Sequence, residues 1–178
     1  MKLKKWQMIL IVVVGVGIVG SFMGGNSDDN SHDTNDVQTV EKEEKKSYKM
    51  NETVRVGDVE YVVSQKVVSK TIGNEYLNQK AQDTYLIIDI SIKNLGNEEL
   101  SSDSFFTLLN GEKKYNTDSS GAIYLGDDSI IYKDVNPDVT LKGKIIFDVP
   151  KNIAESQENI LQVQTGVWGT EKEKISLK

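Results

Sequence analysis

The chain has 178 residues, with 27 acidic and 21 basic side chains and a formal net charge of −6 at neutral pH. It has one histidine and no cysteine, so a disulfide framework and a zinc site built on cysteine and histidine are excluded. The acidic balance argues against nucleic acid as a partner, because phosphate binding needs a basic surface.

Residues 1–25 predict a cytoplasmic basic tip followed by a transmembrane anchor. Lys2, Lys4 and Lys5 precede the uncharged apolar run of residues 6–23, and Trp6 suits the inner membrane boundary. At ~1.5 Å per residue this run gives about 27 Å of helix, close to the ~30 Å hydrocarbon core. Since the lysines stay in the cytoplasm, the rest of the chain should be extracellular, in a single-pass arrangement.

Two further interpretations concern the same segment. The small residues around residues 19–21 would also fit a cleaved secretory signal, and the domain would then be secreted. Gly17, Ser21 and Gly25 recur at four-residue spacing, which lets two helices approach closely, although glycine is common in membrane helices generally. We prefer a retained anchor that does not oligomerise. A lipid anchor is excluded because it requires a cysteine.

Residues 26–47 predict a disordered acidic stalk. Seven acids and three lysines outnumber its few apolar side chains, which cannot offset the entropy of ordering the segment. The acidic cluster at its start has the oxygen ligands that calcium prefers, but a solvated spacer is the simpler interpretation.

Residues 48–178 predict an extracytoplasmic domain of β-strands, because the hydrophobic period becomes two from Val54 onward. Residues 105–109 and 113–115 flank Asn110 and Gly111, a strong hairpin signal. A last pair of strands is expected over residues 160–165 and 174–177. The side chains expected to face inward are Val59, Tyr61, Val63 and Val67, then Leu86, Ile88, Ile90 and Ile92, then Leu141, Ile145, Phe147 and Val149, with Pro150 ending that strand.

No segment of this domain shows a helical period. Seven or eight short strands separated by turns indicate an all-β fold, an antiparallel β-sandwich.

Four stretches, residues 54–63, 85–94, 110–115 and 134–150, resemble the immunoglobulin-like "domain of unknown function" of bacterial surface lipoproteins and membrane-anchored proteins. The likeness covers about residues 50–166 and is most specific over residues 143–150. It implies an immunoglobulin-like sandwich outside the membrane and brings no catalytic residues. The helical anchor would replace the lipid-bearing cysteine of many members. Some members carry a label likening them to a telomeric repeat-binding factor, which an acidic exported domain does not fit.

Several kinds of chemistry find no support in the residues. His32, the single histidine, lies in the predicted stalk, so a Ser–His–Asp or Cys–His relay is excluded. There is no glycine-rich phosphate loop. Residues 134–138 imitate the start of an EF-hand loop, but Val139 and Ile145 occupy positions that require glycine and glutamate. Residues 134–138 and 126–129 are therefore expected to be turns.

The sequence thus predicts no catalytic, cofactor-binding or metal-ligating residues, and it leaves calcium and the ligand-binding residues open. The aromatic side chains that suit either a binding surface or the core are Tyr76, Tyr115, Tyr124, Tyr132 and Trp168. We expect a membrane-anchored, non-enzymatic module that binds a protein or a cell-envelope polymer. The alternatives are an envelope hydrolase that uses two carboxylates and a purely structural or regulatory tether.

Overall fold

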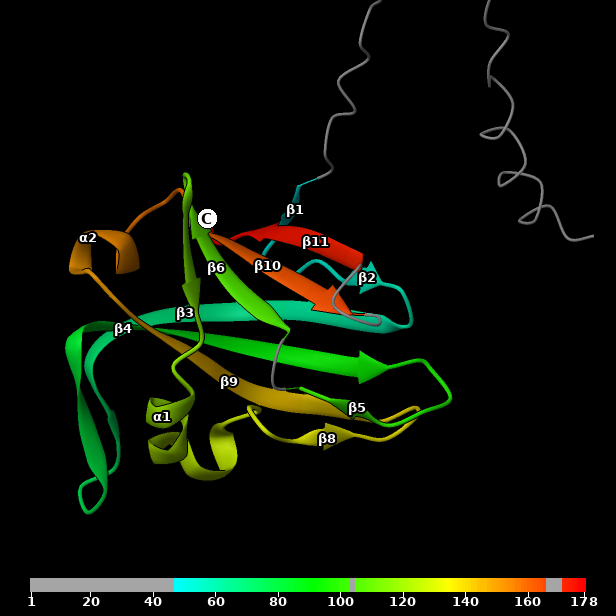
Figure 1. Cartoon of the computed structure of the whole chain (residues 1–178), viewed down its shortest axis with the longest axis horizontal. Coiled ribbons are helices and arrows are strands. Elements are labelled where there is room, and N and C mark those ends of the chain that lie inside the picture. Colours follow the sequence, from blue (N-terminus) through cyan, green and yellow to red (C-terminus); the bar gives the residue numbers. More distant parts are fainter. Residues whose placement is uncertain (1–46, 103–104, 166–170) are drawn as a thin grey trace, which may run out of the picture. The chain divides into compact units, whose positions relative to one another are not determined.

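Strands dominate the part of the chain that the computed structural model describes, which is residues 47–102, 105–165 and 171–178 (Figure 1). One sheet has the order β1 (Tyr48–Lys49), β11 (Glu171–Ser176), β10 (Ile160–Thr165), β6 (Phe106–Asn110) and β7 (Lys113–Asn116). A second has the order β2 (Val54–Val56), β3 (Val59–Gly73), β4 (Asn78–Asn94) and β9 (Thr140–Val149). A short ribbon pairs β5 (Leu100–Ser101) with β8 (Asp134–Val135). The predicted all-β sandwich is confirmed.

Among the described residues, helical structure is confined to short connections: α1 (Ser119–Ala122), the 3₁₀ segment η2 (Ile123–Asp128) and α2 (Lys151–Ala154). Segments of this length are too short to produce a helical hydrophobic period. As predicted, Pro150 follows the last residue of β9, and it forms the N-terminal boundary of α2. No helix in the described ranges is long and apolar enough to cross a membrane. The predicted anchor, residues 6–23, and the predicted stalk lie outside them, apart from Ser47.

The predicted alternation is confirmed in β4 and β9, where every second side chain enters the core between the two larger sheets. The four predicted residues of β4 are buried, as are Ile145, Phe147 and Val149 of β9. Tyr61 connects the sheets, since its hydroxyl donates to the Gln164 carbonyl at 2.8 Å and its ring meets Phe106 edge to face. Burial raises the pKa of the Tyr61 hydroxyl far above its usual value, so this donor stays protonated.

The prediction that Val67 faces the core is wrong. Its side chain is 42% exposed, because Ser64 is an extra residue in β3. Val63 pairs with Ile90 and Gln65 with Asp89, so the pairing shifts by one residue at Ser64. A single inserted residue reverses which side chains face the core, as expected for a β-bulge.

Three further expectations need correction. The sandwich is not wholly antiparallel, because Tyr48 and Lys49 pair in parallel with β11, over a length too short to leave a sequence pattern. The strands are not all short, since β3 has 15 residues and β4 has 17. The hairpin after β6 turns one residue later than expected. Its two loop residues are Gly111 and Glu112, and of these only Gly111 has a positive φ. This pattern is typical of a type II′ turn.

The outer face of the second sheet is partly covered as well. Ile72, Tyr85 and Ile146 form a second buried cluster, against which Tyr124 and Leu125 of η2 pack. After η2 the chain runs close to β9. A Cβ at Gly143 would collide with the Asp128 carbonyl and with the Ile130 side chain, so glycine is required at this point of β9. This contact lies within residues 143–150, the most specific stretch of the sequence resemblance.

Candidate interaction site on the β3–β4 arm

The ends of β3 and β4 extend beyond the sandwich as a bent hairpin, residues 70–83, which we call the arm (Figure 1). Ser69 pairs with Tyr85, whereas Thr71 pairs with Lys80. Lys70 alone therefore stands opposite four residues of β4, and such a mismatch bends the pair of strands sharply. Beyond this bend β4 no longer pairs with β9, whose last partner is Thr84.

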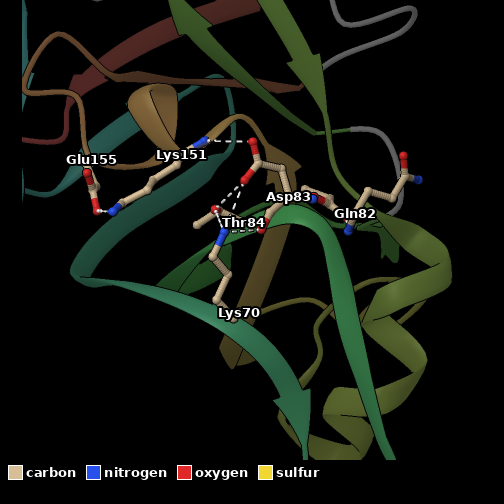
Figure 2. A network of polar contacts seen from close by, with 7 residues as sticks. Lys70, Gln82, Asp83, Thr84, Lys151 and Glu155 are labelled. Carbon is tan, nitrogen blue, oxygen red and sulfur yellow. Dashed lines mark hydrogen bonds and ion pairs between the residues drawn. The ribbon is translucent and has the colours of Figure 1, made fainter.

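Lys70 spans the bend with three hydrogen bonds (Figure 2). Its ammonium donates to the Asp83 carbonyl at 2.6 Å, to the Asp83 carboxylate at 3.1 Å and to the Thr84 hydroxyl at 2.8 Å. The Thr84 hydroxyl in turn donates to Asp83 at 3.0 Å. The Lys70 ammonium thus bridges β3 and β4 across the bend.

Two carboxylates satisfy the backbone amides at the bend. Asp148 of β9 accepts from the amides of Gln82 at 2.6 Å and Asp83 at 3.2 Å, and Asp83 accepts from the amide of Lys151 at 3.3 Å. Hydrogen bonds from Lys70, then Thr84 and Lys151, hold the pKa of the Asp83 carboxyl below its usual value. Lys151 also pairs with Glu155, 3.7 Å away, so the network ties β3 and β4 to α2 (Figure 2).

The arm is also fixed by packing. Ile72, near the end of β3, is buried in the second cluster with Tyr85 and Ile146. Ala81 of β4 packs against the same cluster. Because an apolar side chain of the arm is anchored so near its end, a swing of the whole arm would expose buried surface.

The tip of the arm, residues 74–77, is a tight turn with its own hydrogen bonds. The Asn74 side chain accepts from the amides of Tyr76 and Leu77, both at 2.9 Å, and the Asn74 amide donates to the Leu77 carbonyl at 2.8 Å. Gly73 has φ +98°, and a Cβ there would collide with that carbonyl. Tyr76 is 89% exposed and Leu77 52% exposed. The tip therefore presents an aromatic and an aliphatic side chain on a preorganised backbone.

A shallow groove of about 480 Å³ is the second candidate, on the outer face of the sheet. Its lining consists of Val62, Ser64, Asp89, Ile90, Ser91, Asp128, Lys142, Gly143 and Lys144. The Lys144 ammonium lies 3.2 Å from the Asp128 carboxylate, to which it donates a hydrogen bond, and 3.4 Å from Asp89 in an ion pair. These neighbours, Asp128 first, raise the pKa of Lys144 despite partial burial.

The two carboxylates of this groove, Asp89 and Asp128, differ from the catalytic carboxylate pair of a glycosidase. Such an enzyme needs one carboxyl group in an apolar environment to act as a general acid, whereas Asp89 and Asp128 face the same ammonium. The raised pKa of Lys144 keeps its amine protonated, so it is not poised as a base or nucleophile near neutral pH.

The aromatic residues singled out from the sequence separate into distinct environments. Tyr76 lies at the arm tip, and Tyr132 is 67% exposed in the turn between η2 and β8. Tyr115 packs against the main core and Tyr124 against the second cluster. Trp168 lies outside the described residues. Sequence reasoning did not choose among them and missed the arm, although Gly73 followed by Asn74 is a turn signal.

The prediction that the two acidic segments are turns is only partly right. Asp134 and Val135 form strand β8, and residues 136–138 turn into β9, where the Val139 amide donates to the Asn136 carbonyl at 3.1 Å. Residues 126–128 belong to the 3₁₀ segment η2, whose helical backbone is interrupted at Gly126. His32 lies outside the described ranges. Within those ranges no group of three or more acidic or histidine side chains is placed to hold a metal ion.

A family model, "Domain of unknown function (DUF4352)", matches residues 48–174. The chain belongs to the DUF4352 family. Over 119 residues the chain is 29% identical to the uncharacterized protein YxkC of Bacillus subtilis (strain 168), which covers 61% of this chain and 66% of YxkC. This match spans just under two thirds of that relative.

Solved structures show the same fold. An uncharacterized β-sandwich protein from Clostridium difficile 630 has a TM-score of 0.52 at 21% identity, covering 77% of this chain and 98% of that one. The yjhA protein of Bacillus subtilis has a TM-score of 0.55 at 14% identity, and the match covers 74% of this chain and 99% of yjhA. MPT63, a secreted protein from Mycobacterium tuberculosis, has a TM-score of 0.52 at 14% identity, and the match covers 75% of this chain and 97% of MPT63. These likenesses show a β-sandwich. The framing as an immunoglobulin-like lipoprotein domain stays a prediction, and these matches give no support to the telomeric label.

Proposed function

We propose that this DUF4352 chain is a membrane-anchored, non-enzymatic extracytoplasmic module that recognises a protein or polymer of the cell envelope through the tip of its arm. The observation that carries the proposal is the arm itself. Two carboxylates, a lysine and a buried isoleucine hold the bend, and the result is a fixed turn that exposes Tyr76 and Leu77. Protruding aromatic side chains on rigid backbone are typical binding anchors, because little entropy is lost when they are buried.

The location rests on residues 1–25. The lysines before the apolar run of residues 6–23 favour a single-pass anchor with a cytoplasmic N-terminus and an extracellular domain. Cleavage after the apolar run would release the same domain into the medium. MPT63, a structural neighbour, is described as secreted, which agrees with a sandwich that works outside the membrane.

The groove supports binding in preference to hydrolysis. Its two carboxylates share one protonated lysine, an arrangement that leaves no obvious general acid or base.

Binding to isolated cell envelopes tests the proposal. Residues 43–178 form a compact unit of their own, so this fragment can be purified, labelled and titrated onto washed envelopes. We expect saturable binding that Tyr76→Ser and Leu77→Ser each weaken about tenfold, because anchor residues contribute over 1 kcal/mol each. Val139→Ser, at a half-exposed valine away from the arm, is the matched control and should bind as the parent does. Equal binding by all four proteins would contradict the role of the arm.

A further inference from the structure

One edge of β3 is open beyond the point where β2 ends. β2 pairs only with residues 59–61, and the Asn51 amide covers the Val63 carbonyl at 2.8 Å. After the bulge at Ser64, residues 65–69 of β3 pair with β4 on one side, and no strand among the described residues pairs on the other. Alternate residues of an antiparallel strand point their N–H and C=O groups away from the partner, so this edge offers unpaired hydrogen-bonding groups.

The open edge is apolar on both faces of the sheet. Val67 and Val68 are 42% and 40% exposed, and their partners in β4 are Ile87 and Leu86. Leu86 is fully buried in the core, so Val68 lies on the core side and Val67 on the outer side. A strand added here would therefore cover apolar surface on both faces while pairing the backbone.

Lys66 supplies a second, independent observation. It pairs with Ile88, whose side chain is buried in the core, so Lys66 also projects to the core side of the edge. Its ammonium nitrogen is closed off from solvent and has no hydrogen-bond partner among the described residues. Burial lowers the pKa of Lys66 for the same reason. A buried ammonium without a partner is costly, so a carboxylate brought beside Lys66 would relieve that cost and an added lysine would increase it.

A second copy of the chain would not supply that carboxylate through the same edge. Residues 64–69 read Ser-Gln-Lys-Val-Val-Ser and contain no acid, so self-pairing would bring two such lysines into one sheet. Inward-pointing charges of this kind are a known protection of edges against self-association. The edge thus disfavours its own copy and favours an acidic strand.

We propose that Ser64–Ser69 of β3 is a docking edge for an extended segment of a partner protein, which adds as a further strand and places a carboxylate on the Lys66 ammonium. Backbone pairing supplies affinity in this mode of recognition, and the alternating side chains supply specificity. The edge is distinct from the arm tip, so either surface functions without the other.

Capped six-residue peptides of alternating valine and threonine provide the probe, in three forms with glutamate, glutamine or lysine at one central position. Each is titrated into isotope-labelled residues 43–178 and followed by NMR. We expect shifts in the amides of residues 64–69 and in their β4 partners. The glutamate form should bind about tenfold more tightly than the glutamine form, since charge-assisted hydrogen bonds are the stronger ones. The lysine form should bind most weakly.

Two controls separate strand addition from other binding. A glutamate peptide N-methylated at alternate amides should not bind, because it cannot pair with the edge, and this test leaves the protein unchanged. Lys66→Met should abolish the preference for glutamate over glutamine, whereas Lys142→Met, in the groove, should retain it. Absence of binding by all three peptides at millimolar concentration, shifts confined to other strands, or a glutamate preference that survives Lys66→Met would each overturn the proposal.

Discussion

At the scale of single residues, two neighbours in β4 test the register of the second sheet. Ile90 is 2% exposed and faces the core, whereas Asp89 faces outward and pairs with Lys144. We expect Ile90→Asp to unfold the domain. An unpaired buried carboxylate costs several kcal/mol, a large part of the ~5–15 kcal/mol by which a domain is stable. Asp89→Asn should cost under about 1 kcal/mol, because the ion pair is partly solvated. Urea denaturation of both variants measures the difference, and equal losses would contradict the register.

Gly73 and Gly111 form a second pair at this scale, since both have a positive φ. A Cβ at Gly73 meets the Leu77 carbonyl, while a Cβ at Gly111 has no neighbour within 4 Å. Gly111→Ala should therefore cost only the backbone strain of about 1–2 kcal/mol. Gly73→Ala should cost more and should alter the NMR shifts of Tyr76 and Leu77. A Gly73→Ala variant as stable as Gly111→Ala, with the tip unchanged, would show that the turn has another geometry.

At the scale of elements, the arm should loosen in acid before the sandwich does. The pKa of Asp83 is lowered in the folded state, so its contribution is complete above the ordinary aspartate pKa of about 3.9 and is lost as the pH falls through the lower, folded value. Hydrogen-exchange protection factors of residues 71–80 should therefore fall between pH 5 and pH 2 more steeply than those of residues 86–92. In Asp83→Asn this extra pH dependence should disappear, whereas Glu75→Gln at the tip should keep it. An arm whose protection does not change with pH would contradict this role of the network.

The elements that sequence reasoning predicted are those with one buried and one solvated face. Alternation located β4 from Leu86 to Ile92 and β9 from Ile145 to Val149 because the core buries every second side chain there. It failed after Ser64, where one inserted residue reverses the faces. The arm left no alternation, because most of its side chains are exposed on both faces. Its bend depends on Lys70, Asp83 and Asp148, which approach one another only in the folded chain.

At the scale of the whole molecule, the basic and apolar N-terminus predicts an orientation. We expect protease added to wall-stripped cells to remove residues 48–178 while leaving a membrane-bound N-terminal fragment, because the lysines hold the N-terminus in the cytoplasm. Epitope tags at the two ends would report this on immunoblots. A protected C-terminal tag in intact cells, or a mature protein in the medium that begins near Phe22, would show another arrangement.

The parallel pairing of β1 with β11 has a mechanical consequence. Any tension that reaches the domain through its N-terminal segment acts first on Tyr48 and Lys49, which are paired to β11 over only two positions. β1 is held by these two paired positions and by the partly buried Tyr48 side chain, whereas Val54 and Val56 of β2 are buried in the core. If residues 6–23 anchor the chain as proposed, we expect β1 to detach before β2 under load. The connection to the membrane would then lengthen by a few residues while the rest of both sheets stays paired.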